Sequence, residues 1–339
     1  MALTRIDARD LRGRALRDLR ISVTDRCNFR CGYCMPRELF GPDHAFLPRG
    51  EVLSVAELTR LVEVFVALGV TKIRLTGGEP LLRPDLEQLI TQIAAVPGIE
   101  DIAMTTNGAL LAERAVGLAA AGLTRVTVSL DSVDPLVFAE LADTRVPLQR
   151  VLDGIDAVGR AGLGPVKLNT VLQRGRNEVG LLDLVSYART GGHALRVIEF
   201  MDVGATNGWD RTHVVPSSEV LAAVHAVHPL APVDLPRGDA VAERYRYLDG
   251  AGELGLISSV TKPFCGDCVR ARITAIGQLH TCLFSPVGFD LRTPLRDGSS
   301  DEDLLALVGA RWAGRDDRYS EQRGTIQVTG RPEMSYLGG

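Results

Sequence analysis

The sequence predicts an α/β fold in which six strand-helix units form an open, partial parallel β/α barrel, followed by a C-terminal mixed extension. Two observations predict it. Short β-branched runs alternate with helical patterns from about residue 19 to 228, and prolines from Pro229 onward punctuate irregular, strand-rich sequence. Six consecutive units imply parallel strands joined by right-handed crossovers, and they are too few for a closed eight-stranded barrel.

Each expected strand is a short apolar run that precedes a helix pattern. The expected strands are 19–24, 72–75, 101–105, 125–130, 165–171 and 195–200. The clearest helix follows Ser54, which can act as N-cap with Glu57 three residues on, and its apolar residues recur at helical spacing. Other helices are expected to begin near Pro84-Asp85, Ala109, Pro135, Pro147, Glu178 and Ser217.

Length and composition place the chain among ordinary globular proteins. Its 339 residues exceed the length at which one core usually stops growing, so we expect a barrel over residues 1–228 and a C-terminal region over 229–339. A net charge of -4 gives no sign of a nucleic-acid or anionic-membrane surface. No apolar run approaches the ~18 residues that span a bilayer. Asp7, Asp10 and Asp18 interrupt the arginine-rich start, which argues against a signal or transit peptide, so the expected location is the cytoplasm.

The first cysteine triplet is Cys27, Cys31 and Cys34, in the spacing C-x3-C-x2-C. Three thiolates on one short loop can hold three corners of a 4Fe-4S cube, which leaves the fourth iron open. The alternative is a structural zinc site, which needs four cysteine or histidine ligands. The nearest histidine, His44, lies beyond Gly41-Pro42, so the spacing favours the cluster.

The second triplet is Cys265, Cys268 and Cys282, in the spacing C-x2-C-x13-C. It again offers three ligands for one cubane. His280 stands two residues before Cys282 and could complete a zinc site of three cysteines and one histidine, so zinc stays open here. Two compact triplets with no cysteine left over fit metal ligation better than a secreted disulfide framework.

Polar turns follow several of the expected strands, where barrels of this kind place their chemistry. These turns are 76–80, 105–108, 129–132 and 199–202. In Gly77-Gly78-Glu79-Pro80 the glycines allow close backbone approach, and their carbonyls with the carboxylate would attract an ammonium group. The alternative is a tight strand-to-helix turn with no ligand.

Basic residues stand inside the apolar strand runs. Arg74 lies between Ile73 and Leu75, and Lys167 interrupts a similar run. A strand buried on both faces rarely tolerates an unpaired charge, so a ligand anion would pair them. The alternative for any single basic residue is a solvated surface charge. Arg270 and Arg272 would share one face of an extended segment. No G-x-x-x-x-G-K-[ST] loop is present, so side chains would have to hold a phosphate.

The first triplet, with Tyr33 before its last cysteine, resembles the signature of the radical S-adenosylmethionine (SAM) superfamily. Nearly the whole chain closely resembles the GTP 3′,8-cyclase family of that superfamily. This family catalyses the first step of molybdenum cofactor biosynthesis. The matching stretches are 19–31, 74–80, 196–201, the second triplet and the terminal Gly338-Gly339. No motif position departs from the family pattern.

This resemblance implies two 4Fe-4S clusters, SAM, and a lyase that cyclises GTP to (8S)-3′,8-cyclo-7,8-dihydroguanosine 5′-triphosphate. In the family a 5′-deoxyadenosyl radical takes the ribose 3′ hydrogen, and the C3′ radical attacks C8 of guanine. The implied catalytic cluster ligands are Cys27, Cys31 and Cys34, and the second cluster's are Cys265, Cys268 and Cys282. The implied SAM contacts are Tyr33, Gly78, Ser129 and Met201. The implied GTP contacts are Arg20, Arg74, Thr105, Lys167, Arg270, Ala271 and Arg272.

The resemblance also implies partners: an electron donor protein and a downstream cyclic pyranopterin monophosphate synthase. It implies that the Gly338-Gly339 tail is threaded toward the substrate pocket. The oligomeric state is open, with a homodimer as one option, and neither nucleic acid nor membrane is an expected partner. A radical SAM enzyme acting on another substrate, such as a peptide, is the alternative enzyme. A non-catalytic iron-sulfur carrier or zinc-stabilised scaffold is the third possibility, and it would need neither the Gly-Gly-Glu motif nor buried basic residues.

Overall fold

The computed structural model describes residues 3–233, 241–325 and 330–338, and their strands form one sheet. The strand order is β12-β11-β10-β1-β2-β3-β4-β5-β6-β9-β8-β7. The parallel centre consists of β1 (Asp18–Ser22), β2 (Lys72–Thr76), β3 (Asp101–Thr106), β4 (Arg125–Ser129), β5 (Lys167–Leu172) and β6 (Ala194–Glu199). All six expected strands are confirmed, with ends that shift by a few residues, and so is the expected fold class.

Helices connect the parallel strands and cover the outer side of the sheet. They are α1 (Val55–Ala67), α2 (Leu86–Ala94), α3 (Leu111–Ala120), α4 (Pro135–Ala142), α5 (Leu148–Arg160), α6 (Leu181–Thr190) and α7 (Ser217–Val227). Short 3-10 turns are η1 (Pro80–Leu82), η2 (Glu178–Gly180), η3 (Arg211–His213), η4 (Cys265–Asp267) and η5 (Tyr319–Glu321). The predicted capping box is present, because Ser54 accepts from the amide of Glu57 and Glu57 accepts from the amide of Ser54. In the described ranges no helix combines the length and apolarity that crossing a membrane requires.

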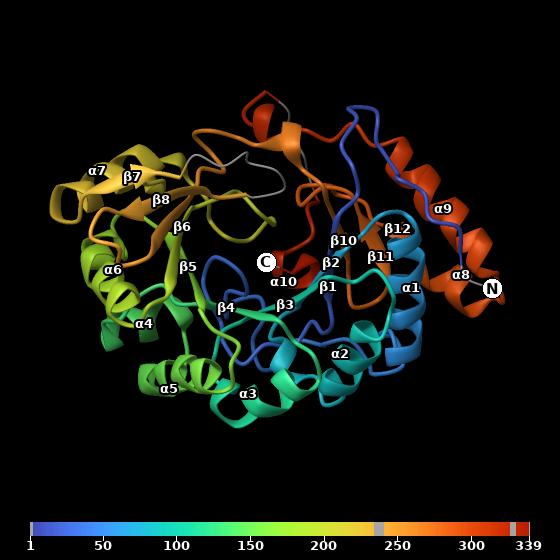
Figure 1. Ribbon diagram of the computed structural model, residues 1–339, viewed down its shortest axis with the longest axis horizontal. Helices are drawn as coiled ribbons and strands as arrows, with labels where there is room; N and C mark the ends of the chain where they lie inside the picture. Colours follow the sequence, from blue (N-terminus) through green and yellow to red (C-terminus); the bar gives the residue numbers. More distant parts are fainter. Residues whose placement is uncertain (1–2, 234–240, 326–329, 339) are drawn as a thin grey trace.

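The C-terminal extension lengthens the sheet at both edges. Its elements are β7 (Leu230–Pro232), β8 (Glu243–Tyr247), β9 (Glu253–Ile257), β10 (Arg270–Ile273), β11 (Gln278–His280), β12 (Phe289–Asp290), α8 (Arg292–Arg296), α9 (Asp301–Ala313) and α10 (Met334–Leu337). β9 pairs in parallel with β6, and β10 pairs in parallel with β1. The late chain therefore flanks the barrel strands on both sides, and α10 lies inside the curve of the strands (Figure 1).

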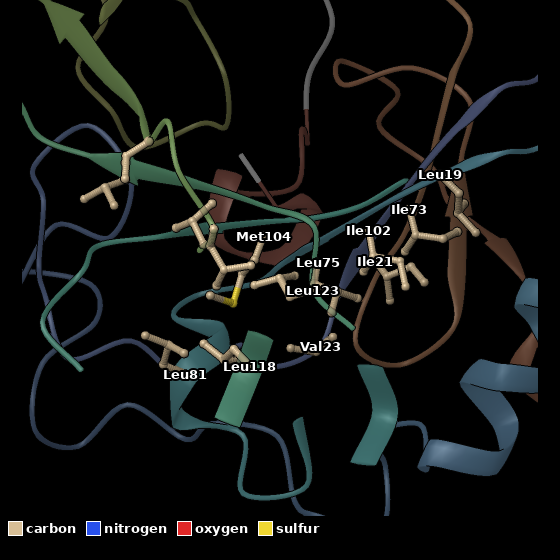
Figure 2. Close-up of a cluster of buried hydrophobic side chains, with 14 of the residues drawn as sticks. Leu19, Ile21, Val23, Ile73, Leu75, Leu81, Ile102, Met104, Leu118 and Leu123 are labelled. Carbon is tan, nitrogen blue, oxygen red and sulfur yellow. The ribbon is translucent and has the colours of Figure 1, made fainter. Parts of the chain in front are cut away.

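Successive residues of each central strand face opposite sides of the sheet. Leu19 and Ile21 of β1, with Ile73 of β2, face the helices and are almost completely buried in the main hydrophobic core. Figure 2 shows these side chains clustered with Ile102 of β3. The alternate residues of the same strands face the inside of the curve, and many of them are polar or charged. This alternation separates the packed core from the candidate site.

Candidate active site

A cavity of about 610 Å³ lies on the inner face of the curved sheet. Nearly all the site residues expected from the sequence line it. These are Cys27, Cys31, Cys34, Cys265, Cys268, Cys282, Tyr33, Gly78, Ser129, Met201, Arg20, Arg74, Thr105, Lys167, Arg270 and Arg272. The fold therefore brings both cysteine triplets and the basic strand residues to one place.

Ala271 is the exception. Its side chain is fully buried in the hydrophobic core and does not line the cavity. The reason is strand alternation, since Arg270 and Arg272 on either side of it face the cavity. The methyl group of Ala271 therefore lies on the opposite face of β10 from its two basic neighbours.

Three arginines form a row across neighbouring strands. Arg272 of β10 is the register partner of Arg20 on β1, which is in turn the partner of Arg74 on β2. The Nε atom of each is buried without a hydrogen-bond partner among the described residues. Burial lowers the pKa of Arg20 and Arg74, and it lowers that of Arg272 to about 10, with repulsion from Arg270 adding to the effect. A row of buried cations with free donors is suited to a multiply charged anion.

Lys167 and Arg196 extend the basic wall toward the other edge of the sheet. Burial lowers the pKa of Lys167 to about 7, and the charge of Arg196 contributes to the shift. Burial and the charge of Arg74 lower the pKa of Arg196 to about 10. Arg196 lines the cavity and was missed as a site residue in the sequence. The signal was available, because Arg196 lies between the buried Leu195 and Val197, as Lys167 lies between buried apolar neighbours.

The two glycines after β2 are required by close backbone approach. A Cβ atom at Gly78 would lie 2.3 Å from the carbonyl oxygen of Arg26. A Cβ atom at Gly77, whose φ is +149°, would lie 2.6 Å from the carbonyl oxygen of Thr24. No side chain fits at either position, so the turn packs directly on the loop that leads to the first cysteine triplet.

Glu79 ties this turn to the end of β3. Its carboxylate accepts hydrogen bonds from the Thr106 hydroxyl at 2.7 Å, the Asn107 amide at 2.7 Å and the Leu81 amide at 3.0 Å. Burial raises the pKa of Glu79 to about 7. The motif is therefore both a tight turn and part of the cavity wall, because Gly77, Gly78 and Glu79 all line the cavity.

The first triplet presents three sulfur donors to the cavity. Cys27 Sγ accepts from the Phe29 amide at 3.4 Å and from Asn107 Nδ2 at 3.9 Å. In the part of the chain that the structure describes, no three His, Cys, Asp or Glu side chains converge on a site for a single metal ion. In a 4Fe-4S cubane each thiolate binds a different iron, so the three sulfur atoms can lie farther apart than the ligands of a single metal ion. The three cysteines, which all line the cavity, therefore fit a 4Fe-4S cluster whose fourth iron would face the cavity.

Tyr33 and Met201 both line the cavity, and each contacts neighbouring residues that hold it there. The Tyr33 hydroxyl donates to Asp131 Oδ2 at 2.6 Å, and burial raises the pKa of Tyr33 well above its usual range. Asp131 Oδ1 accepts from the Val171 amide at 2.8 Å, which anchors the pair to β5. Met201 packs against the small apolar cluster that contains Phe284 and also lines the cavity.

The second triplet combines η4 with the segment after β11. Burial raises the pKa of the Cys268 thiol, but the charges of Arg270 and Arg315 outweigh it and lower the pKa to about 6, so the thiolate is favoured. His280, the fourth ligand of the zinc alternative, does not line the cavity, and its imidazole lies against Gly288. The donors that face the cavity are three sulfurs, which fits a cubane with an open iron.

The end of the described chain enters the cavity. Gly338 lines it, next to Thr76 and Gly77. A Cβ atom at Gly338 would lie 1.8 Å from Thr76 Oγ1, and φ of Gly338 is +72°. Only glycine fits there. Gly339, the other half of the expected tail, lies outside the described residues.

Two family models match the chain in succession. Residues 21–188 match the Radical SAM superfamily, and residues 193–321 match Molybdenum Cofactor Synthesis C. Curated relatives of the chain carry the name GTP 3′,8-cyclase. The chain is 49% identical to the one from Acidothermus cellulolyticus over 357 residues, covering 98% of this chain and 99% of the relative. It is 44% identical to the one from Staphylococcus haemolyticus over 336 residues, covering 98% of each.

A solved structure shares the fold. Streptococcus suis SuiB bound to S-adenosylmethionine aligns with a TM-score of 0.60 and 16% identity, covering 91% of this chain and 68% of SuiB. At that identity the likeness concerns the fold alone. It extends beyond the six barrel units, because the alignment covers most of the C-terminal extension as well.

Proposed function

The chain belongs to the GTP 3′,8-cyclase family of radical SAM enzymes, and from this premise we propose that it cyclises GTP to (8S)-3′,8-cyclo-7,8-dihydroguanosine 5′-triphosphate. This reaction is the first step of molybdenum cofactor biosynthesis. One observation carries the proposal: a single cavity is lined by two cysteine triplets and by a row of buried arginines whose Nε atoms have no hydrogen-bond partner among the described residues.

The first triplet would hold the catalytic 4Fe-4S cluster through Cys27, Cys31 and Cys34. When bound, this cluster and SAM supply a 5′-deoxyadenosyl radical that can take a hydrogen atom from unactivated carbon. Around the cluster, Gly78 offers backbone groups that no side chain shields, and the cavity wall also includes the expected SAM contacts Tyr33, Ser129 and Met201.

The basic wall would bind the triphosphate. Arg20, Arg74 and Lys167 line the cavity without a carboxylate at ion-pair distance in the described ranges, and each sits on a strand of the rigid sheet. We add Arg196 to this set because it shares their exposure to the cavity and their depressed pKa. Thr105 lies 3.3 Å from Arg74 Nη1 and would orient that guanidinium. Arg270 and Arg272, beside the second triplet, would hold the nucleotide toward the second cluster's open side.

The role of this chain's residues in the chemistry is positional. Joining C3′ of the ribose to C8 of guanine requires both atoms to be held close together while water is kept away. The basic wall would fix the triphosphate end of the nucleotide, and the second triplet would fix the base end. Gly338 and α10 occupy the inside of the curved sheet and would help to exclude water (Figure 1).

The test is anaerobic turnover of the reconstituted protein with SAM, a strong reductant and GTP, with ATP as the control nucleotide. Mass spectrometry follows 5′-deoxyadenosine and the nucleotide products. A cyclised nucleotide that forms from GTP and not from ATP supports the proposal. SAM cleavage with GTP untouched would refute the substrate assignment and favour the alternative of another substrate, such as a peptide. Added cyclic pyranopterin monophosphate synthase should consume the product, and an electron donor protein should replace the chemical reductant.

A further inference from the structure

Beside the second triplet lies a buried ion-pair group, consisting of Asp10, Arg14 and Arg315, to which the proposed reaction assigns no role. Asp10 Oδ2 lies 2.6 Å from Arg14 Nε and 3.1 Å from Arg315 Nη1. Asp10 Oδ1 accepts from the amides of Arg12 and Arg14, both at 2.9 Å. The side chains of Asp10, Arg14 and Arg315 are 0%, 2% and 1% exposed. A buried carboxylate with all its acceptor sites engaged holds both arginines in one geometry.

Both arginines also donate hydrogen bonds to backbone carbonyl oxygens of the second triplet. Arg14 Nη1 donates to the carbonyl oxygen of Cys265 at 2.8 Å. Arg315 Nη1 donates to the carbonyl oxygen of Cys268, also at 2.8 Å. One carboxylate, Asp10, thus positions one donor for Cys265 at the start of η4 and one for Cys268 directly after it.

The same network reaches the third cysteine. Arg315 Nε lies 3.5 Å from Asp317 Oδ2, which accepts from the Thr281 hydroxyl at 2.6 Å. Thr281 directly precedes Cys282. Arg14 Nη1 also donates to the Asp317 carbonyl oxygen at 2.8 Å. Both cysteine-bearing segments, one with Cys265 and Cys268 and the other with Cys282, are therefore tied to Arg14 and Arg315, the second of them through Asp317.

Packing holds the network rigid. The Arg315 guanidinium stacks on the Trp312 ring, 4.5 Å from the ring centroid. Trp312 is 1% exposed, and its indole nitrogen lies 3.3 Å from the Arg14 carbonyl oxygen, to which it donates. Helix α9 thus carries the stacking partner, and the segment after it carries Arg315 itself. Neither arginine can swing away without opening a packed, buried region.

We propose that Asp10, Arg14 and Arg315 are positioning residues for the second cysteine triplet. They hold its separate segments in the arrangement that the cluster needs, and they place two fixed positive charges beside it. The inference rests on the proposed function, which assigns a 4Fe-4S cluster to this triplet. Groups around metal ligands orient those ligands, and nearby charge sets a cluster's reduction potential.

The test uses full-length reconstituted protein in which Cys27, Cys31 and Cys34 are all replaced by Ala, so that iron resides only at the second site. Asp10→Asn and Arg315→Gln are made in this parent. Both should release iron to a chelator about 10–100-fold faster than the parent. Arg315→Gln removes the donor to the Cys268 carbonyl oxygen, and Asp10→Asn removes the carboxylate that holds both arginines. Asp301→Asn is the control, since it removes the charge of the carboxylate in the 2.6 Å Arg60–Asp301 pair. The other acceptors of Arg60 are the carbonyl oxygens of Leu295 and Ser299, outside the segments that carry the cysteines.

The midpoint potential of the second cluster distinguishes an effect of the charges of Asp10 and Arg315 from an effect of their structural support alone. Arg315→Gln should shift the potential negative, because a positive charge that favours the reduced cluster is lost. Asp10→Asn should shift it positive, because the arginines lose their counter-charge. Arg315→Lys keeps the charge and most of the volume, so it serves if Arg315→Gln does not fold. The Arg315→Lys variant should release iron faster than the parent, with little change in the midpoint potential of the second cluster.

Iron release at the parental rate from both Asp10→Asn and Arg315→Gln, or from the folded Arg315→Lys variant, would overturn the positioning role. Potentials that shift in the same direction for Asp10→Asn and Arg315→Gln would overturn the charge role. A parent that holds no iron at all would instead remove the second cluster from the proposed function, and this inference with it. These failures are distinguishable because the last one is seen before any of the new variants is made.

Discussion

Arg20 on β1 and Arg272 on β10 face the same cavity as direct register partners on neighbouring strands. Neighbouring strands lie ~4.8 Å apart, so two guanidinium groups stand side by side in a buried setting. Burial lowers the pKa of both, and no carboxylate in the described ranges forms an ion pair with either. The charge of Asp18, which also lines the cavity, opposes this shift in both arginines but does not cancel it, and a bound polyanion would relieve more of the cost of burying like charges together. The site is therefore built at the expense of stability in the unliganded protein.

Arg272→Gln should raise the KM for GTP about 10–100-fold, since hydrogen bonds to a charged group contribute about 1.5–3 kcal/mol. The same change should leave the thermal midpoint of the cluster-free protein unchanged or raise it, because one of several mutually repelling charges is removed. Arg174→Gln, which breaks the exposed pair with Glu219, is the control and should alter neither quantity. An unchanged KM in Arg272→Gln would contradict the assignment of this guanidinium to the substrate.

Lys167 should make GTP binding depend on pH. Burial lowers the pKa of Lys167 to about 7, so in the free protein the ammonium loses its proton as the pH rises through about 7. A triphosphate favours the charged form, so binding should take up a proton near pH 7 and weaken between about pH 7 and 9. Anaerobic calorimetry at both pH values, in buffers of different ionisation enthalpy, measures the affinity and the proton uptake.

Lys167→Arg is the matched control for that measurement, because a guanidinium stays charged over the whole range. Its GTP affinity should vary with pH only as far as the nucleotide itself does. If the variant and the parent weaken in parallel, the pH dependence comes from elsewhere, and Lys167 does not contact the triphosphate.

The two cysteine triplets should be separable by function. Cys265→Ala should bind about four fewer irons per chain, still cleave SAM, and lose cyclisation of GTP. Cys27→Ala should lose both SAM cleavage and cyclisation. Iron analysis, together with quantification of 5′-deoxyadenosine and cyclised nucleotide in the same samples, shows which triplet supports which step. Normal cyclisation by Cys265→Ala would exclude the second cluster from the reaction.

Gly338→Ala should lower turnover strongly while leaving the thermal midpoint nearly unchanged. A Cβ atom there would lie 1.8 Å from Thr76 Oγ1, so the chain end would have to leave the cavity wall. Gly330→Ala is matched to it, because Gly330 has the same φ of +72° and nothing within 4 Å of its Cβ position. Equal losses in both variants would mean that left-handed backbone strain, and not the position in the cavity, causes the effect.

The sequence alone determined what depends on near neighbours. Ser54 with Glu57 starts α1 as a capping box, and the apolar period of two around Arg74 and Lys167 marked strands whose charges need a ligand. The spacing of Cys27, Cys31 and Cys34 predicted a 4Fe-4S site there, because three thiolates on one short loop are close whatever the rest of the chain does.

Only the tertiary structure decided which distant segments meet. The pairing of β10 with β1 sets Arg272 beside Arg20, and the segment after α9 brings Arg315 to Asp10 and Cys268. Helix and strand periods arise from contacts between residues a few positions apart. Strand order arises from hydrogen bonds and burial between segments that no local pattern links, so those neighbours could not be deduced from the sequence.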